Sequence, residues 1–240
     1  MNELSLTLNN FRQWIKAGDH PIAKKLFSFA IFLRCIEIPA PRFLFKIIWL
    51  VHQSITRGMI EIIRVFYWTP IFKSRVQAIG SNLYLYSGMP LIIGPLKLDI
   101  GNNVRLSGQT TLIGRNGNAS LPTLKIGSNV DIGWQSTIAV GRKVKIGNNV
   151  RIAGRAFLAG YPGHPENPKN RAKGLPDTVD QIGDIVLEDD VWLATGVTVI
   201  AGVKIGRGSI IAAGSVVTKD IPEYVLAGGC PARIIKAINH

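Results

Sequence analysis

The chain has 240 residues, a formal net charge of +13 and two cysteines, Cys35 and Cys230, that lie far apart in the sequence. This length accommodates one large domain with an appendage. Two isolated cysteines exclude a disulfide framework and are typical of a reducing cytosol. The first residues lack a basic stretch followed by an apolar one, so they predict no signal peptide.

Residues 1–20 form a mostly polar N-terminal segment, and residues 21–75 follow as an amphipathic helical region. The pattern predicts two helices, over 21–38 and 41–66, separated by the prolines at 39 and 41. Polar residues of the second helix recur at spacings of 4, 7, 4, 4 and 3, which is one narrow stripe at helical period. They are Arg42, Lys46, Gln53, Arg57, Glu61 and Arg64.

Residues 1–75 hold eleven basic and four acidic residues, and the longest uncharged run there, 47–56, has ten residues. A membrane-spanning helix needs about 20 apolar residues. We therefore expect residues 21–75 to lie in the plane of an anionic membrane surface, with the protein peripheral on the cytoplasmic face of the cell membrane. The alternative is that these helices pack on the rest of the chain or on partner subunits. No nucleic-acid module accompanies the charge, so no nucleic-acid partner is expected.

From residue 187 to residue 221, aliphatic side chains recur at every sixth position without a slip. They are Leu187, Leu193, Val199, Ile205, Ile211 and Val217. A period of six indicates a parallel β-helix, in which each hexad gives one short strand and one corner, and the aliphatic side chain stacks inward. The glycines at 196, 202, 208 and 214 suit the corners, because a positive φ carries no Cβ penalty for glycine.

Earlier residues continue this repeat in groups of three hexads that are separated by interruptions. The groups are Ile100, Leu106 and Leu112; Ile126, Ile132 and Ile138; and Ile146, Ile152 and Leu158. Three hexads in each group predict a triangular coil, with the asparagine pairs at 102–103 and 148–149 and the Ser-Asn pair at 128–129 at equivalent corners. We therefore expect a mainly β fold, a parallel β-helix over 76–240, with a long polar loop at 159–186 where functional residues are usually placed.

The loop contains His164-Pro165, followed by Arg171 and Gly174. Further along come Val191-Trp192, then GSVVTKDIP at 214–222 and GCPARIIK at 229–236. In this order the segments resemble the hexapeptide-repeat acyltransferases, specifically the maltose and galactoside O-acetyltransferase branch. The resemblance covers about residues 100–238, and the helical region before it differs from that branch.

The resemblance implies a left-handed β-helix, a homotrimer with the active site between neighbouring subunits, and acetyl-CoA as the acyl donor. His164 inherits the role of general base, and a histidine is suited to taking a proton from a hydroxyl at neutral pH. Contacts to acetyl-CoA are implied for Trp192, Thr195, Ala213, Thr218, Lys219, Arg233 and Lys236. A purely packing role for Trp192, and a surface helix end at 233–236, are the alternatives.

The acceptor site departs from that branch, because its sugar-binding asparagine aligns near Gly133 here. Trp134 and Gln135 stand beside that position, and together with Arg171 they are the candidate substrate-binding residues. Four carboxylates are candidates for orienting the imidazole, or are solvated corner residues: Asp131, Glu166, Glu188 and Asp189. The repeats contain one internal histidine, so the three-histidine zinc site that the same fold can carry is not expected and no metal is predicted.

These features together predict an acetyl-CoA-dependent O-acetyltransferase that modifies a sugar hydroxyl of a lipid-linked or polysaccharide precursor at the cytoplasmic membrane face. Two alternatives stay open at this point. One is an N-acyltransferase that acts on an amino sugar, and the other is a non-catalytic membrane scaffold for polysaccharide synthesis.

Overall fold

The computed structural model describes residues 3–117 and 120–239, in two compact units that divide between Ile55 and Thr56. The helical elements are α1 (Glu3–Ala17), α2 (Pro21–Arg34), α3 (Arg42–Ile63), the π-helix η1 (Arg64–Trp68), α4 (Thr69–Lys73), α5 (Pro168–Ala172) and the 3₁₀-helix η2 (Val179–Gln181). The division falls inside α3, and not at the boundary between 75 and 76 that the change of sequence pattern suggests.

The first unit contains α1, α2 and the beginning of α3, so residues 3–17 of the polar N-terminal segment are helical. His20 begins α2, because its Nδ1 accepts a hydrogen bond from the Ile22 N–H at 3.2 Å, and Pro21 occupies the first helical position. The helix ends at Arg34, four residues before the expected end at 38. Within the described ranges, no helix combines the length and apolarity that crossing a membrane requires.

The end of the helical region packs on the β-helix and closes its first coil. Phe72 is 1% exposed within the β-helix core, and Trp68 packs against the same cluster. Arg64 pairs with Glu61 at 2.6 Å, and its guanidinium lies 4.8 Å from the centroid of the Tyr84 ring. The expectation that the helices pack on the rest of the chain therefore holds for residues 61–72, because an open solenoid end must be covered.

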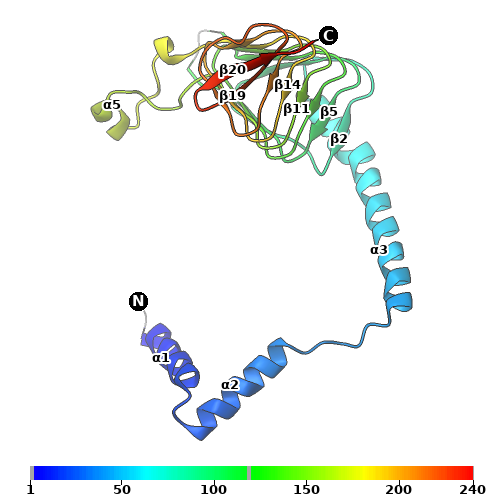
Figure 1. Cartoon of the computed structure of the whole chain (residues 1–240), viewed down its shortest axis with the longest axis vertical. Helices are drawn as coiled ribbons and strands as arrows, with labels where there is room; N and C mark the ends of the chain where they lie inside the picture. Colours follow the sequence, from blue (N-terminus) through cyan, green and yellow to red (C-terminus); the bar gives the residue numbers. More distant parts are fainter. Residues whose placement is uncertain (1–2, 118–119, 240) are drawn as a thin grey trace. The chain divides into compact units, whose positions relative to one another are not determined.

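Three sheets form the walls of the β-helix, whose stacked coils are visible in Figure 1. Sheet A contains β1 (Ala78–Ile79), β4 (Lys97–Ile100), β7 (Thr123–Ile126), β10 (Lys143–Ile146), β13 (Ile185–Leu187) and β16 (Lys204–Ile205). Sheet B contains β2 (Tyr84–Tyr86), β5 (Arg105–Ser107), β8 (Asp131–Ile132), β11 (Arg151–Ile152), β14 (Trp192–Leu193), β17 (Ile210–Ile211), β19 (Val225–Gly229) and β20 (Ala232–Ala237). Sheet C contains β3 (Leu91–Ile93), β6 (Thr111–Gly114), β9 (Thr137–Val140), β12 (Phe157–Ala159), β15 (Thr198–Ile200) and β18 (Val216–Val217). The expected triangular coil is confirmed.

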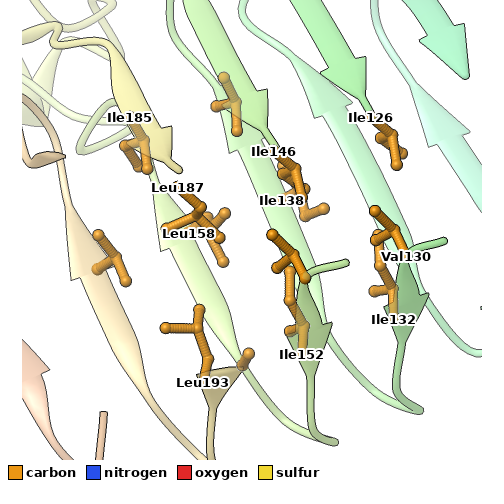
Figure 2. Packing of buried hydrophobic residues seen from close by; sticks show 14 of the residues in the cluster. Ile126, Val130, Ile132, Ile138, Ile146, Ile152, Leu158, Ile185, Leu187 and Leu193 are labelled. Atoms are coloured by element: carbon orange, nitrogen blue, oxygen red, sulfur yellow. The ribbon is translucent and has the colours of Figure 1, made fainter. Parts of the chain in front are cut away.

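The aliphatic side chains of successive coils stack in register, as the period of six predicts. In sheet A, Ile126 pairs with Ile146, and Ile146 pairs with Leu187 across the long loop. In sheet B, Ile152 stands between Ile132 and Leu193 in the same way. Figure 2 shows these side chains pointing into the interior. Each fully buried aliphatic side chain contributes roughly 1.5–3 kcal/mol of hydrophobic free energy.

The expected corner residues have the backbone conformation that the corners require. Asn103, Asn129 and Asn149 have φ angles of 55°, 55° and 58°. Their side chains form a ladder between coils, in which the Asn129 amide donates to Asn149 at 2.8 Å and the Asn149 amide donates to Asp190 at 2.9 Å. Glycines 196, 202, 208 and 214 also have positive φ, as predicted. The three asparagines and Gly208 lie at the corner between sheets A and B. Gly196 and Gly214 lie at the corner between sheets B and C, and Gly202 lies at the corner between sheets C and A.

Candidate active site

The long loop leaves the β-helix at the corner between sheet C and sheet A, after β12, and returns at β13. It contains α5 and η2, and it extends away from the stacked coils in Figure 1. Asn167 begins α5, because its side-chain oxygen accepts hydrogen bonds from the N–H groups of Lys169 and Asn170. His164 lies in the turn just before Asn167. Its side chain is exposed, so the imidazole is accessible to a substrate.

A buried ion pair fixes the loop to the body of the β-helix. Arg115, which follows β6, donates from Nε to Asp177 Oδ1 at 2.5 Å and from Nη2 to the Asp177 carbonyl at 2.7 Å. Both residues are 6% exposed. The second carboxylate oxygen of Asp177 accepts the Gly163 N–H at 3.0 Å. The pair therefore holds the backbone of the residue directly before His164.

Arg171 contacts the backbone directly after His164. Its guanidinium donates to the carbonyls of Pro165 and Glu166, each at 3.1 Å. The structure thus gives this candidate substrate-binding residue a contact with the backbone that follows His164. Two guanidinium groups, those of Arg115 and Arg171, brace the turn that carries the imidazole.

Tyr161 belongs to the same cluster. Burial raises the pKa of its phenol, the nearby Asp177 carboxylate raises it further, and Arg115 acts in the opposite direction. Beside it lies a cavity of about 380 Å³ at the base of the loop. Its lining consists of Ala159, Tyr161, Pro162, Glu166, Asp180, Gln181, Ile200 and Ala201. One phenol, two carboxylates and one amide are groups that hydrogen-bond to hydroxyls.

Trp134 and Gln135 lie at a different corner, between sheets B and C. The Trp134 ring covers the backbone of Gly154, where a Cβ would stand 2.7 Å from the indole nitrogen. The guanidinium of Arg155 lies 4.8 Å from the ring centroid, and its Nε donates to Gln135 at 3.2 Å. The exposed indole is thereby held flat against the coil, with one face covered by a cation.

Thr195 and Ala213 continue this edge in the following coils. The Gly196 N–H donates to the Gly154 carbonyl at 3.0 Å, and the Gly214 N–H donates to the Thr195 carbonyl at 2.9 Å. Thr195 and Ala213 are exposed there. The edge thus presents small side chains in a line beyond Trp134, which leaves room for an extended ligand.

Trp192 and Lys236 line one groove of about 540 Å³ on the outer face of sheet B. The other lining residues are Ala194, Ile210, Ala212, Leu226, Ala237, Ile238 and Asn239. Trp192 is 49% exposed, so about half of its surface is available to a ligand. Arg233 and Lys236 belong to strand β20, which pairs antiparallel with β19, so the alternative of a surface helix end is wrong.

Thr218 and Lys219 return to the corner between sheets C and A, two coils beyond the loop. Asp220 anchors this turn, since its carboxylate accepts the Lys204 N–H at 2.8 Å. Trp192, Arg233 and Lys236 thus lie on sheet B, and the other eight candidate residues lie along two edges of the β-helix. Trp134, Gln135, Thr195 and Ala213 lie on the edge between sheets B and C, whereas His164, Arg171, Thr218 and Lys219 lie on the edge between sheets C and A.

Three of the four carboxylates considered for orienting His164 take part in ion pairs elsewhere. Asp131 pairs with Arg105 at 3.1 Å, Glu188 with Lys204 at 2.7 Å, and Asp189 with Arg207 at 3.6 Å. The fourth, Glu166, lines the cavity beside Tyr161. Asp177, which the sequence analysis missed, accepts a hydrogen bond from the backbone directly before His164. In the ranges 3–117 and 120–239, no group of three His, Cys, Asp or Glu residues could hold a metal ion.

Comparisons with known proteins agree with this fold. Residues 184–219 match the family model "Bacterial transferase hexapeptide (six repeats)". The solved structure of an N-acyltransferase from Bacillus cereus, AntD, superimposes with a TM-score of 0.59 and 20% sequence identity, over 73% of this chain and 91% of that one. The part of the chain from β1 to β20 is thus a left-handed parallel β-helix of hexapeptide repeats.

The curated proteins that match include two named acetyltransferases. The galactoside O-acetyltransferase of Lactococcus lactis is 43% identical over 76 residues, or 32% of this chain and 35% of that protein. The 2,3,4,5-tetrahydropyridine-2,6-dicarboxylate N-acetyltransferase of Clostridium perfringens is 48% identical over 54 residues, or 22% of this chain and 23% of that protein. The matched part is thus about a third or less of each relative's length. The chain resembles the hexapeptide-repeat acyltransferases, as the motifs indicate.

Proposed function

We propose that this protein is an acetyltransferase that moves the acetyl group of acetyl-CoA to a sugar hydroxyl, with His164 as the general base. The observation that carries this proposal is the exposed His164 on a turn that a buried ion pair and a second guanidinium hold in place. A base must keep its position relative to a bound hydroxyl, and such bracing provides that position. The similarity to a galactoside O-acetyltransferase supports the choice of an acetyl group and a hydroxyl.

The proposed reaction is a direct transfer between two bound substrates. The acceptor hydroxyl gives its proton to the His164 imidazole as its oxygen attacks the thioester carbonyl. The carbon–sulfur bond then breaks, an ester forms, and the CoA thiolate leaves and takes up the proton from the imidazolium. Histidine serves both steps because it both accepts and donates a proton near neutral pH.

The donor fits the groove of Trp192 and Lys236 and the neighbouring edge of small residues. Lys236 and Arg233 supply cations for the phosphate groups of CoA, and Thr195 and Ala213 leave room for its extended arm. Lys219 supplies a third cation, on the same edge as His164. We infer a homotrimer, because residues on two separate edges of one β-helix would come together where neighbouring subunits meet.

The acceptor is, in our proposal, a lipid-linked or polysaccharide precursor at the cytoplasmic face of the membrane. The cavity of about 380 Å³ beside Tyr161 supplies hydroxyl-binding groups. Large apolar side chains in the first unit support a membrane surface, since Phe32 is 62% exposed, Phe43 74% and Ile38 79%. Arg64 is engaged with Glu61 and Tyr84. The stripe cations left for this surface are therefore the exposed Arg42, Lys46 and Arg57.

Release of free CoA from acetyl-CoA, with sugar and glycolipid acceptors, tests the proposal. We expect CoA release that depends on an acceptor and yields a product from which mild alkali removes the acetyl group. An alkali-stable product would instead support the N-acyltransferase that acts on an amino sugar, which the similarity to an N-acetyltransferase favours. Absence of acetyl transfer to either kind of acceptor would favour the non-catalytic scaffold.

A further inference from the structure

Helices α1 and α2 line a groove. The turn between them passes through Gly18, which has a φ of 67°, and His20 begins α2. The groove has a volume of about 550 Å³. Its lining consists of Arg12, Ile15, Lys16, Phe27, Ala30, Ile31 and Arg34.

The groove concentrates positive charge without a balancing carboxylate. Arg12 and Lys16 stand four residues apart on one face of α1, where like charges repel each other and destabilise a helix. Arg34 adds a third cation from the last turn of α2. Asp19 is the only acidic residue between positions 5 and 34, and it is outside the lining. Among the described residues, none of these three cations forms an ion pair. An anion would relieve this repulsion.

The remaining walls of the groove are apolar. Phe27 is 40% exposed and Ile31 45%, and Ile15 completes the apolar surface from α1. A small inorganic anion would leave these side chains in water, whereas a neutral lipid would leave the three cations without partners. The lining therefore matches a molecule that has an anionic head and an apolar chain.

We propose that the groove between α1 and α2 binds the phosphate headgroup of an anionic membrane lipid. The phosphate oxygens accept hydrogen bonds from Arg12, Lys16 and Arg34, and the first part of the acyl chain contacts Phe27 and Ile31. This inference rests on the membrane-surface part of the proposed function. It adds α1 to the membrane-binding region and makes the contact specific to a phosphate.

Vesicle sedimentation with the full-length protein tests this site. The vesicles contain phosphatidylcholine alone or phosphatidylcholine mixed with phosphatidylglycerol. The groove variant is Arg12→Gln/Lys16→Gln/Arg34→Gln. The matched control, Lys24→Gln/Lys25→Gln/Arg42→Gln, removes the same charge from exposed positions outside the groove. The variant Arg12→Lys/Arg34→Lys keeps the charge.

We expect the wild-type protein to bind only the vesicles that contain phosphatidylglycerol. The groove variant should bind them at least about ten-fold more weakly than the control does, because non-specific attraction to the surface counts only the number of cations. The charge-keeping variant should retain most of the binding. Circular dichroism should give the same helix content for all four proteins.

Three results would overturn the site. Equal loss in the groove variant and its control would mean that attraction is diffuse. Displacement of the protein from vesicles by inorganic phosphate at matched ionic strength would mean that the groove takes a free anion. Wild-type protein that ignores both kinds of vesicle would remove the membrane-surface proposal too. Acetyl transfer to a soluble acceptor is measured in a separate assay. A failure of the catalytic proposal is therefore distinguishable from a failure of the lipid site.

Discussion

The β-helix and the first helical unit use apolar residues in opposite ways. In the β-helix the stacked aliphatic positions are buried, and Leu158, Leu187 and Ile205 are each 0% exposed. In the helices before residue 56, Phe32 and Phe43 are more than half exposed. A repeat of six closes its own core coil by coil, whereas these helices do not cover their apolar residues within this chain. The contrast indicates that the β-helix buries its own core once residues 61–72 cover its open end. The helices before residue 56 leave their apolar side chains available to a partner surface, which we propose to be the membrane.

His164 separates the two proposed roles most clearly, because we assign it to acetyl transfer and not to membrane binding. His164→Ala should lower kcat by about 10²–10⁴-fold, because it removes the general base from an exposed loop position. Binding to anionic vesicles and the thermal midpoint should stay at their wild-type values. Steady-state acetyl transfer and vesicle sedimentation measure the two roles, and Lys173→Ala in the same loop serves as the control. Near-normal turnover in the His164 variant would contradict the proposed mechanism.

One substitution in the β-helix core and one at an exposed position of α2 compare what the two apolar side chains contribute to the free energy of unfolding. Leu158→Ala should reduce the free energy of unfolding by about 2–5 kcal/mol, because it leaves a cavity between stacked coils. Phe32→Ala should change it by less than about 0.5 kcal/mol, since most of that side chain is already in water. Urea denaturation of the full-length protein measures both. A cost at Phe32 as large as at Leu158 would show that α2 packs against another subunit.

The loop should depend on its buried ion pair more than on an exposed one. Asp177→Ala leaves Arg115 without its carboxylate partner in a buried place, which typically costs about 3–5 kcal/mol unless the structure opens. We expect the loop to open locally, with faster tryptic cleavage at Lys169 and Arg171 and reduced kcat. The control is Asp184→Ala, which breaks the more exposed 2.9 Å pair with Arg142 and should cost less than about 1 kcal/mol. Equal cleavage rates in the two variants would refute the bracing role of Asp177.

The sequence predicted the β-helix well because its signal is local and periodic. The aliphatic repeat, the positive φ at Asn129 and Asn149, and the triangular coil all follow from spacing. The expected left-handed fold and the resemblance to hexapeptide-repeat acyltransferases also agree with the comparisons. The roles of His164 and of the implied donor and acceptor contacts stay predictions.

The missed features are those that depend on contacts distant in the sequence. Arg115 and Asp177 are 62 residues apart, and each stands in a polar, aperiodic segment where a buried charge looks like a solvated one. Phe72 closes the first coil from a helix whose composition resembles that of the exposed helices. The signal at Asp177 was weak, because the loop carries other carboxylates that remain at the surface. Helix α1 was missed because its polar residues obscure a short apolar face.

The smallest expected effect concerns the proton on Tyr161. Burial raises the pKa of Tyr161 above its ordinary value of 10.0, with a further increase from Asp177 and an opposing effect from Arg115. A raised pKa in the folded state means that the neutral phenol stabilises the loop fully below the ordinary value, and that this stabilisation is lost as the pH rises through the folded-state pKa. Loop protection from proteolysis should therefore decline at strongly alkaline pH.

Asp177→Asn provides the sharpest test of this assignment. Loss of the carboxylate charge should lower the pKa of Tyr161, because one of the two causes that raise it is gone while Arg115 remains. Tyr86 is the internal control, since burial and Asp131 raise its pKa on sheet B and Asp177 is not among the causes. NMR titration with labelled tyrosine follows both phenols in one sample. If Tyr161 titrates at its ordinary value in the wild-type protein, the loop does not close over the phenol as the buried ion pair requires.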